Sequence, residues 1–494
     1  MNGPFGERAL PARFFMFDFL LLNAMVYDGS GGAPRACNVG LGGGLISAVG
    51  CPANADSRAR LDLRGLALAP GFIDVHSHSD TYILTHPEAT SKITQGVTTE
   101  ICGQCGASAA PLFEGATLPS DWEAVGHPGA WQSVAEYRDV LAQAKPAVNI
   151  ALFAGHNTLR KGVMGYAPRV ATAEEVARMA RRLEAALDEG AAGLTTGLLY
   201  NPGLYAAPEE LLTLVRIAAG HGALYATHLR SEGEKLLEAL DEAIGLAGDS
   251  GVSLQISHLK TAGPENACKL PAALEKIHNA QARGVRIHAD RYPYLASGTD
   301  LDVILPEWAS AGGRAAILAR LGDPAQRRRI VAELEGTRWG DIMIGATWYA
   351  SLLATRGKTL DVVAREWDLP PGETALRILE LDETRTGAFF FGMNPANLET
   401  ICREPYVMPG SDASLRSLEG PLSLDHPHPR AFGTFPRYLN MVTRMNHPLS
   451  LSEAIRRMTS LPAEAFGLRD RGRVAVGARA DGFVIVCDCL ERFE

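Results

Sequence analysis

Cysteine is scarce in this chain: there are 8 among 494 residues, and only Cys102 and Cys105 form a CxxC spacing. This small, scattered number excludes the disulfide framework of a small secreted protein and favours a reducing cytoplasm. One CxxC without a thioredoxin-like unit or a second CxxC does not indicate a redox pair or a structural zinc knuckle.

A surplus of positive charge and a long apolar run are also lacking. The formal net charge of −9 argues against nucleic acid or an anionic membrane as the main partner. A small anionic substrate stays compatible, because an acidic protein can hold a local basic pocket. The apolar patch at 12–17 is interrupted by Asp18, and the run ending at Leu22 is too short to span a bilayer. No A-x-A-like site follows directly, so a signal peptide is the less favoured interpretation.

The length predicts one large core and a smaller second domain. Short apolar runs and glycine turns at 18–50 and again at 472–486 indicate β-structure at both ends of the chain. We therefore expect a small β-sandwich domain built from residues 1–69 and 459–494. Residues 70–458 would form the central domain between them.

The central part alternates between helical and extended patterns. Helical spacing at 173–189 follows the N-cap candidate Thr172 and ends before Gly190. Further helical stretches and buried strands follow with a repeat of about 30 residues, which is the rhythm of a parallel sheet. This favours a (β/α)₈ TIM-like barrel, with an open sheet as the alternative. Residues 306–400 break the rhythm and predict a helical insertion, either a lid over the site or peripheral helices.

The strongest local pattern is the HxH of His76 and His78, which directly follows the strand-like Phe72-Ile73-Asp74-Val75. Residues two apart on a strand face the same side, so both imidazoles can reach one divalent metal. Two more histidines, His228 and His258, each end a buried strand, 30 residues apart. In a parallel barrel the ends of these strands lie side by side at the carboxyl rim, where barrel enzymes place their sites.

Two further features have an ordinary and a chemical interpretation. Cys105 follows a β-branched strand and is flanked by glycine; its thiolate would be a strong zinc ligand, although a small buried cysteine is the common alternative. Asp412 follows the turn Met408-Pro409-Gly410-Ser411, where an aspartate is usually a turn residue. A barrel hydrolase, however, needs a carboxylate near its metal to move a proton.

Taken in order, these motifs resemble the amidohydrolase superfamily and, within it, the D-aminoacylases (N-acyl-D-amino-acid deacylases), from about residue 18 to about 488. This branch replaces the usual carboxylated lysine with a cysteine in a Gly-x-Cys-Gly turn, here Gly103-Gln104-Cys105-Gly106. Gln104 stands where relatives often have Asn. Further branch-like stretches lie at 155–160, 196–203, 227–232, 257–260, 292–294 and 428–436.

The resemblance implies roles for the matching residues. Cys105, His228 and His258 would hold the tighter Zn²⁺, and His76, His78 and Asp412 a weaker neighbouring site; whether one or two metals bind stays open. Asp412 would be the catalytic acid and base. Lys260, Tyr292, Ser297 and Arg430 would bind the substrate carboxylate. Cys102 is expected to be a packing residue, and His156 either supports the site or is structural.

The implied reaction is hydrolysis of an N-acyl-D-amino acid to a carboxylate and a free D-amino acid. No basic residue lies in 302–306, after Tyr292-Pro293-Tyr294, where relatives that take acidic D-amino acids carry an arginine, so an apolar side chain is expected. Three alternatives remain. They are a dipeptidase for peptides with a C-terminal D-residue, a cyclic amidase of the hydantoinase kind with Lys161 as its bridging lysine, and a non-catalytic relative. The oligomeric state is not indicated.

Overall fold

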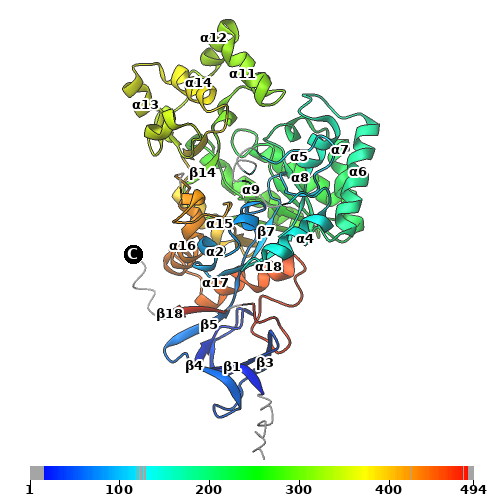
Figure 1. Cartoon of the computed structure of the whole chain (residues 1–494), viewed down its shortest axis with the longest axis vertical. Helices are drawn as coiled ribbons and strands as arrows, with labels where there is room; N and C mark the ends of the chain where they lie inside the picture. Colours follow the sequence, from blue (N-terminus) through cyan, green and yellow to red (C-terminus); the bar gives the residue numbers. More distant parts are fainter. Residues whose placement is uncertain are drawn as a thin grey trace, which may run out of the picture. The chain divides into compact units, whose positions relative to one another are not determined.

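A computed structural model describes residues 16–119, 122, 126, 129–423, 426–481 and 483–487. Residues 12–15 of the apolar N-terminal patch and both extreme ends of the expected small β domain lie outside these residues. The chain divides into two compact units: unit 1 comprises Met1–Gly71 and Leu451–Glu494, and unit 2 comprises Phe72–Ser450 (Figure 1).

Unit 1 contains a six-stranded sheet built from both ends of the chain, as the sequence predicts. Its strands are β1 (Phe17–Val26), β2 (Arg35–Gly42), β3 (Leu45–Val49), β4 (Ser57–Asp62), β5 (Leu66–Pro70) and β18 (Phe483–Cys487). β1 is shared: its first half pairs with β4 and its second half with β5, and an irregularity between Leu21 and Ala24 separates the two halves. The short helices α17 (Leu451–Met458) and α18 (Ser460–Ala465) complete the unit.

Unit 2 is a (β/α)₈ barrel, which confirms the predicted fold. Its strands in ring order are β6 (Phe72–Asp74), β7 (Val97–Cys102), β8 and β9 (Asn149–Leu152 and Ala154–Gly155, one strand position), β10 (Gly193–Gly197), β11 (Leu224–His228), β12 (Ser253–Ile256), β13 (Ile287–Arg291) and β17 (Val407–Pro409). Every pairing between named neighbours is parallel, and a parallel bridge between Ser77 and Ala413 closes the ring between β6 and β17.

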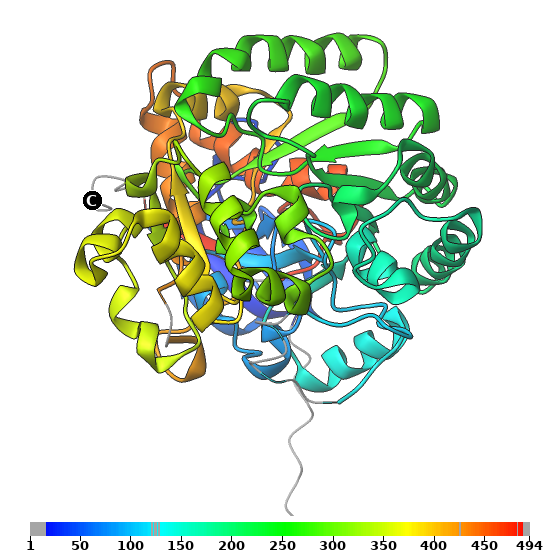
Figure 2. The ribbon, with the colours of Figure 1, turned by 90° about the horizontal axis from the view of Figure 1, so that it is seen from above.

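Helices surround the strands of this barrel (Figure 2). They are α1 (Tyr82–Thr85), α2 (Thr90–Ile93), α4 (Val134–Ala144), α5 (His156–Met164), α6 (Ala173–Asp188), α7 (Pro208–Gly220), α8 (Leu236–Ser250), α9 (Leu270–Ala282), α15 (Pro395–Arg403) and α16 (Arg430–Arg444). The predicted start of α6 is confirmed, because Thr172 and Glu175 form a reciprocal capping box. Among the described residues no helix has the length and apolar character that crossing a bilayer requires.

The insertion between β13 and α15 has its own small core. It contains α10 (Glu307–Ser310), α11 (Arg314–Gly322), α12 (Pro324–Glu333), α13 (Leu360–Trp367) and α14 (Pro371–Leu381) around an antiparallel sheet of β14 (Ala296–Asp300), β16 (Gly387–Phe391) and β15 (Ile342–Ile344). The sequence predicted its helices but not this sheet, which also begins before residue 306. Helices α11 to α14 stand apart from the ring of barrel helices (Figure 1).

Candidate active site

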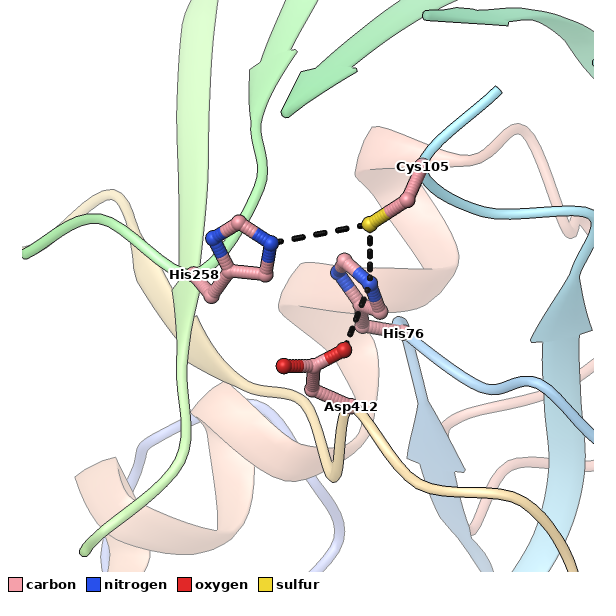
Figure 3. Close-up of side chains that lie close together, drawn as sticks. All are labelled: His76, Cys105, His258 and Asp412. Atoms are coloured by element: carbon pink, nitrogen blue, oxygen red, sulfur yellow. Dashed lines mark hydrogen bonds and ion pairs between the residues drawn. The ribbon is translucent and has the colours of Figure 1, made fainter. Parts of the chain in front are cut away.

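Four of the predicted metal ligands converge at the carboxyl ends of the barrel strands: His76, Cys105, His258 and Asp412 (Figure 3). Their ligand atoms all lie within 4.8 Å of one another. Cys105 Sγ is 3.4 Å from His76 Nε2 and 3.5 Å from His258 Nε2. Asp412 Oδ1 is 3.3 Å from His76 Nε2. A thiol, two imidazoles and a carboxylate at these separations are a donor set suited to zinc.

His78 and His228 flank this cluster. His78 Nε2 lies 3.1 Å from Asp412 Oδ1. The His228 ring centroid is 4.4 Å from that of His258, and both of its ring nitrogens are buried without a hydrogen-bond partner among the described residues. Buried polar atoms are normally paired, so an unpaired imidazole beside a thiol and a second imidazole fits a metal ligand. The structure thus brings all six predicted ligands to one place.

The charges around Cys105 favour its thiolate. Burial alone would raise the pKa of this thiol, but the positive charge of His76 and the neighbouring imidazoles of His228 and His258 hold the pKa well below its usual range. Asp412 follows the same pattern. Burial would raise the pKa of its carboxyl group, and the charges of Arg430, His76 and His258 hold that pKa well below its usual range. Both groups are therefore anionic and able to bind a cation.

Three of the candidate ligands have a left-handed backbone: φ is +53° at Cys105, +37° at His258 and +49° at Asp412. This conformation is uncommon for residues other than glycine and persists where the surroundings enforce it. The Cys105 turn shows how: a Cβ at Gly106 would lie 2.5 Å from Asn157 Oδ1 and 2.6 Å from Gly197 N. Glycine is required there, which explains the Gly-x-Cys-Gly pattern.

Asp290, at the end of β13, supports the site but was missed in the sequence. Its carboxylate lies 3.1 Å from His76 Nδ1 and accepts hydrogen bonds from the backbone N–H of His258 (2.9 Å) and from Gln255 Nε2 (2.9 Å). A carboxylate on the second nitrogen of an imidazole fixes the ring and frees the other nitrogen for a metal. The available signal was its position near the end of a buried strand, two residues before Tyr292, because the candidate histidines also lie near the ends of their strands.

Lys92 on α2 is the second feature that sequence reasoning missed. Its ammonium group is fully buried, 2.8 Å from both Asp74 Oδ2 and Glu100 Oε1. Asp74 also accepts the backbone N–H of Ser411 (2.8 Å), and the next N–H, of Asp412, donates to the carbonyl of His76 (2.8 Å). This ion cluster therefore holds β6, β7 and the Asp412 loop in register beneath the candidate ligands.

Glu232, which the sequence motif included without a role, lies on the other side of the cluster. One of its oxygens is 2.8 Å from His258 Nδ1 and forms an ion pair with Lys260. The predicted carboxylate binder Lys260 is thus already paired in this structure. Its Nζ also lies 2.7 Å from His258 Nδ1. Burial would raise the pKa of Glu232, but Lys260 and the two histidines lower it, so this side chain is anionic.

The other predicted substrate-binding residues border the same cavity, whose volume is about 1770 Å³. Arg430 places Nη1 2.7 Å from Asp412 Oδ2 and donates from Nη2 to the carbonyl of Gly298 (3.1 Å). The buried hydroxyl of Tyr292 has no partner among the described residues, and its ring lies 4.8 Å from the Arg430 guanidinium. Burial raises the pKa of Tyr292, but Lys260, Arg291 and Arg430 together lower it. Ser297 lines the cavity from β14.

Three residues singled out in the sequence lie outside the cluster. His156 Nε2 is 2.8 Å from Glu210, which also pairs with Arg160, so this buried triad links α5 to α7. Cys102 is fully buried, and burial raises the pKa of its thiol, which fits a packing residue. Lys161 lies with Nζ 5.1 Å from the Tyr166 ring centroid, on α5, where a bridging carboxylated lysine is not expected.

Comparison with known proteins agrees with this geometry. A model described as the Amidohydrolase family matches residues 60–331 and 420–491, more than half of the chain. The chain belongs to the amidohydrolase family. This amidohydrolase is 35% identical to the N-acyl-D-glutamate deacylase of Alcaligenes xylosoxydans xylosoxydans over 477 residues, which cover 96% of this chain and 88% of the relative.

Two more relatives of this amidohydrolase are informative. It is 35% identical to the D-aminoacylase of the same organism, over 94% of this chain and 87% of the relative. The crystal structure of N-acyl-D-glutamate deacylase from Bordetella bronchiseptica, complexed with zinc and a phosphonate inhibitor, matches with a TM-score of 0.81 and 31% identity, over 95% of this chain and 90% of that one. The resemblance drawn from the motifs is confirmed, and the chain is a hydrolase of this family.

Proposed function

We propose that this amidohydrolase uses zinc to hydrolyse the amide bond of N-acyl-D-amino acids, releasing a carboxylate and a free D-amino acid. The observation that carries the proposal is the convergence of Cys105, His76, His258 and Asp412 in a cavity that Lys260 and Arg430 also line. Relatives named for this activity, one of them complexed with zinc, support it.

The proposed ligand roles are those that the family resemblance implies. Cys105, His228 and His258 would hold the tighter zinc, with His76, His78 and Asp412 forming the weaker neighbouring site. When bound, zinc supplies Lewis acidity that polarises an amide carbonyl and makes water a better nucleophile.

Asp412 would carry the proton. Its Oδ2 is engaged by Arg430, so Oδ1 is the oxygen that faces the cluster, 3.1 Å from His78 Nε2 and 3.3 Å from His76 Nε2. Oδ1 would take a proton from the attacking water and return it to the leaving nitrogen.

The substrate carboxylate would bind at Arg430, Lys260, Tyr292 and Ser297. Arg430 offers a planar donor pair suited to a carboxylate, and the unpaired Tyr292 hydroxyl adds a third donor. Arg430 contacts Asp412 directly, so the residue that would anchor the substrate also holds the residue that would transfer the proton. This arrangement fixes the α-carbon, so the hand of the amino acid is decided by the direction its side chain takes.

We propose an apolar side chain for the D-amino acid. The chain is equally identical, at 35%, to the glutamate deacylase and to the D-aminoacylase, so sequence identity does not favour either substrate. The proposal rests instead on the residues that line the cavity. Between Tyr294 and Pro306 the cavity is lined by residues that include Asp300, Asp302, Val303 and Leu305, with no basic side chain in this segment; the arginines of the lining come later in the chain. In this segment an acidic side chain would meet the like charges of Asp300 and Asp302, whereas leucine, methionine or phenylalanine would contact Val303 and Leu305.

The test is zinc content together with hydrolysis of N-acetyl-D-leucine, N-acetyl-L-leucine and N-acetyl-D-glutamate. We expect chelator-sensitive turnover, with the D-leucine compound cleaved fastest. In Cys105→Ala the value of kcat/KM should fall by roughly 10²-fold or more. The matched control is Cys102→Ala, three residues away, which should retain zinc and activity.

Two results would contradict the proposal in different ways. Zinc bound without turnover of any of the three compounds would refute the deacylase function, and dipeptides with a C-terminal D-residue and hydantoins would be assayed next. Faster cleavage of N-acetyl-D-glutamate than of N-acetyl-D-leucine would refute only the apolar preference.

A further inference from the structure

The cavity has two chemically different walls. The wall built by the insertion and by residues from 228 onward carries acidic and basic side chains, among them Glu232, Lys260 and Arg430. The wall built by residues 104–205 is different: apart from the candidate ligand Cys105, Lys161 is the one charged side chain among its described lining residues, and its Nζ lies 5.1 Å from the Tyr166 ring centroid. Apolar and aromatic residues make up much of this second wall, including Ala107, Leu118, Tyr166, Leu199, Tyr200 and Leu204.

The position of the apolar wall follows from the barrel. The carboxylate subsite lies on the side of β12 and β13, which carry Lys260 and Tyr292 just after their ends. In the ring of eight strand positions, β7 and the β8/β9 position lie opposite β12 and β13. A substrate held by its carboxylate with its amide at the metal cluster must therefore direct its acyl group towards β7–β10, along this wall.

The wall begins at the metal cluster itself. The Tyr200 ring centroid is 4.8 Å from that of His228, and the backbone N–H of Leu198 donates to the carbonyl of His228 (3.2 Å). Leu199, between these two residues, is 40% exposed, and Tyr166, farther along the wall, is 37% exposed. Large apolar side chains left exposed inside a concave, otherwise polar site are typical of a ligand-binding surface.

The size of the cavity argues for a large occupant. Pockets for drug-sized ligands usually enclose roughly 300–1,000 Å³, and this cavity encloses about 1770 Å³. An acetyl group would end beside His228 and leave Leu199 and Tyr166 uncovered. A longer apolar chain would cover both and gain hydrophobic free energy with each methylene group.

We infer that the wall formed by Ala107, Leu118, Tyr166, Leu199, Tyr200 and Leu204 is an acyl-chain subsite, and that the preferred substrates carry a medium-chain aliphatic acyl group rather than acetyl. This inference rests on the proposed deacylase function and names its acyl specificity. None of these six side chains carries a charge, as contact with an alkyl chain requires.

The test compares N-octanoyl-D-leucine with N-acetyl-D-leucine on the full-length zinc enzyme. We expect kcat/KM to be at least ~10-fold higher for the octanoyl compound, because each buried methylene contributes to binding. Leu199→Asp should lower the octanoyl-to-acetyl ratio of kcat/KM at least ~5-fold by placing a charge on the wall. The matched control Leu353→Asp changes a leucine that is 50% exposed outside the cavity, and should leave the ratio as in the wild type.

A measurement on the unaltered enzyme covers the case in which Leu199→Asp does not fold. Octanoate should inhibit the wild-type enzyme competitively at lower concentration than acetate. Cleavage of the acetyl compound at a rate equal to or above that of the octanoyl compound would overturn the acyl-chain inference and leave the deacylase function intact. Failure to cleave either compound would instead overturn the deacylase function, and the inference with it.

Discussion

Lys92 is a fully buried cation that faces two buried carboxylates, Asp74 and Glu100. Burial would lower the pKa of its ammonium group, but the two carboxylates raise it, so the lysine stays charged. A buried ion pair adds little net stability compared with an apolar replacement of the whole cluster, yet removing one partner is costly. The role of Lys92 is therefore to neutralise the buried carboxylates of Asp74 and Glu100, which lie beneath the candidate metal ligands.

Replacing this lysine should show that cost. In Lys92→Met two carboxylates face each other without a counter-ion, and we expect the free energy of unfolding to fall by roughly 3–5 kcal/mol, measured by urea denaturation. The control is Lys276→Met, which removes a surface ion pair with Asp241 and should cost at most about 1 kcal/mol. Equal losses in the two variants would refute the role given to Lys92.

At the scale of elements, His428 links the start of α16 to β14 of the insertion. Its Nδ1 accepts the backbone N–H of Arg430 (3.0 Å), and its Nε2–H donates to the carbonyl of Ala296 (3.0 Å). Only a neutral imidazole with the proton on Nε2 can make both bonds. Burial, then the charge of Arg430, lowers the pKa of His428 to about 3.

This shift predicts a loss of stability in acid. Between pH 6.5 and pH 3 the unfolded chain binds a proton at residue 428 that the folded protein does not, so the free energy of unfolding falls as the pH falls. From pH 6.5 to pH 4.5 this one group contributes a loss of roughly 2–3 kcal/mol. In His428→Gln the fall, measured by urea denaturation at both pH values, should be smaller by that amount. An unchanged pH dependence in the variant would contradict the neutral link.

The helices and strands also differ in how far the sequence alone predicted them. The helix starting at Thr172 was predicted because its capping box is a local pattern. The strand that ends at His228 and the strand that ends two residues before His258 were predicted because buried apolar runs ended at polar residues. The sheet of the insertion was missed because β14 reads Ala-Ser-Gly-Thr-Asp and β15 has only three residues, so neither carries an alternating pattern.

The residues of the site likewise fall into those that a local sequence pattern marks and those that only the folded structure reveals. His76 and His78 are two residues apart in the chain, so their spacing alone indicated a shared metal. Asp290 and Lys92 act on the ligands through contacts made only in the folded barrel, between residues far apart in sequence. No local pattern marks such a pair, and the resemblance to a family named the ligands but not these supports.

At the scale of the whole molecule, the candidate ligands join distant parts of unit 2. They lie at or just after the ends of β6, β7, β11, β12 and the last barrel strand β17, so the donors run from His76 to Asp412 along the chain. The unfolded chain cannot bring them together, and an ion that binds them binds the folded state alone. Zinc should therefore stabilise the whole barrel and not only the loops at the carboxyl ends of its strands.

This coupling gives the last prediction. At a free zinc concentration of about 1,000 times the dissociation constant, binding adds about 4 kcal/mol to the stability of unit 2, and its thermal midpoint should rise by several degrees over chelated protein. Cys105→Ala should abolish most of this rise, because it removes the thiolate shared by His76 and His258, whereas the exposed Cys268→Ala should preserve it. The comparison is made by calorimetry with and without zinc. An equal rise in both variants would mean that zinc binds elsewhere, since Cys105 supplies the one sulfur of the cluster and its loss cannot leave that affinity unchanged.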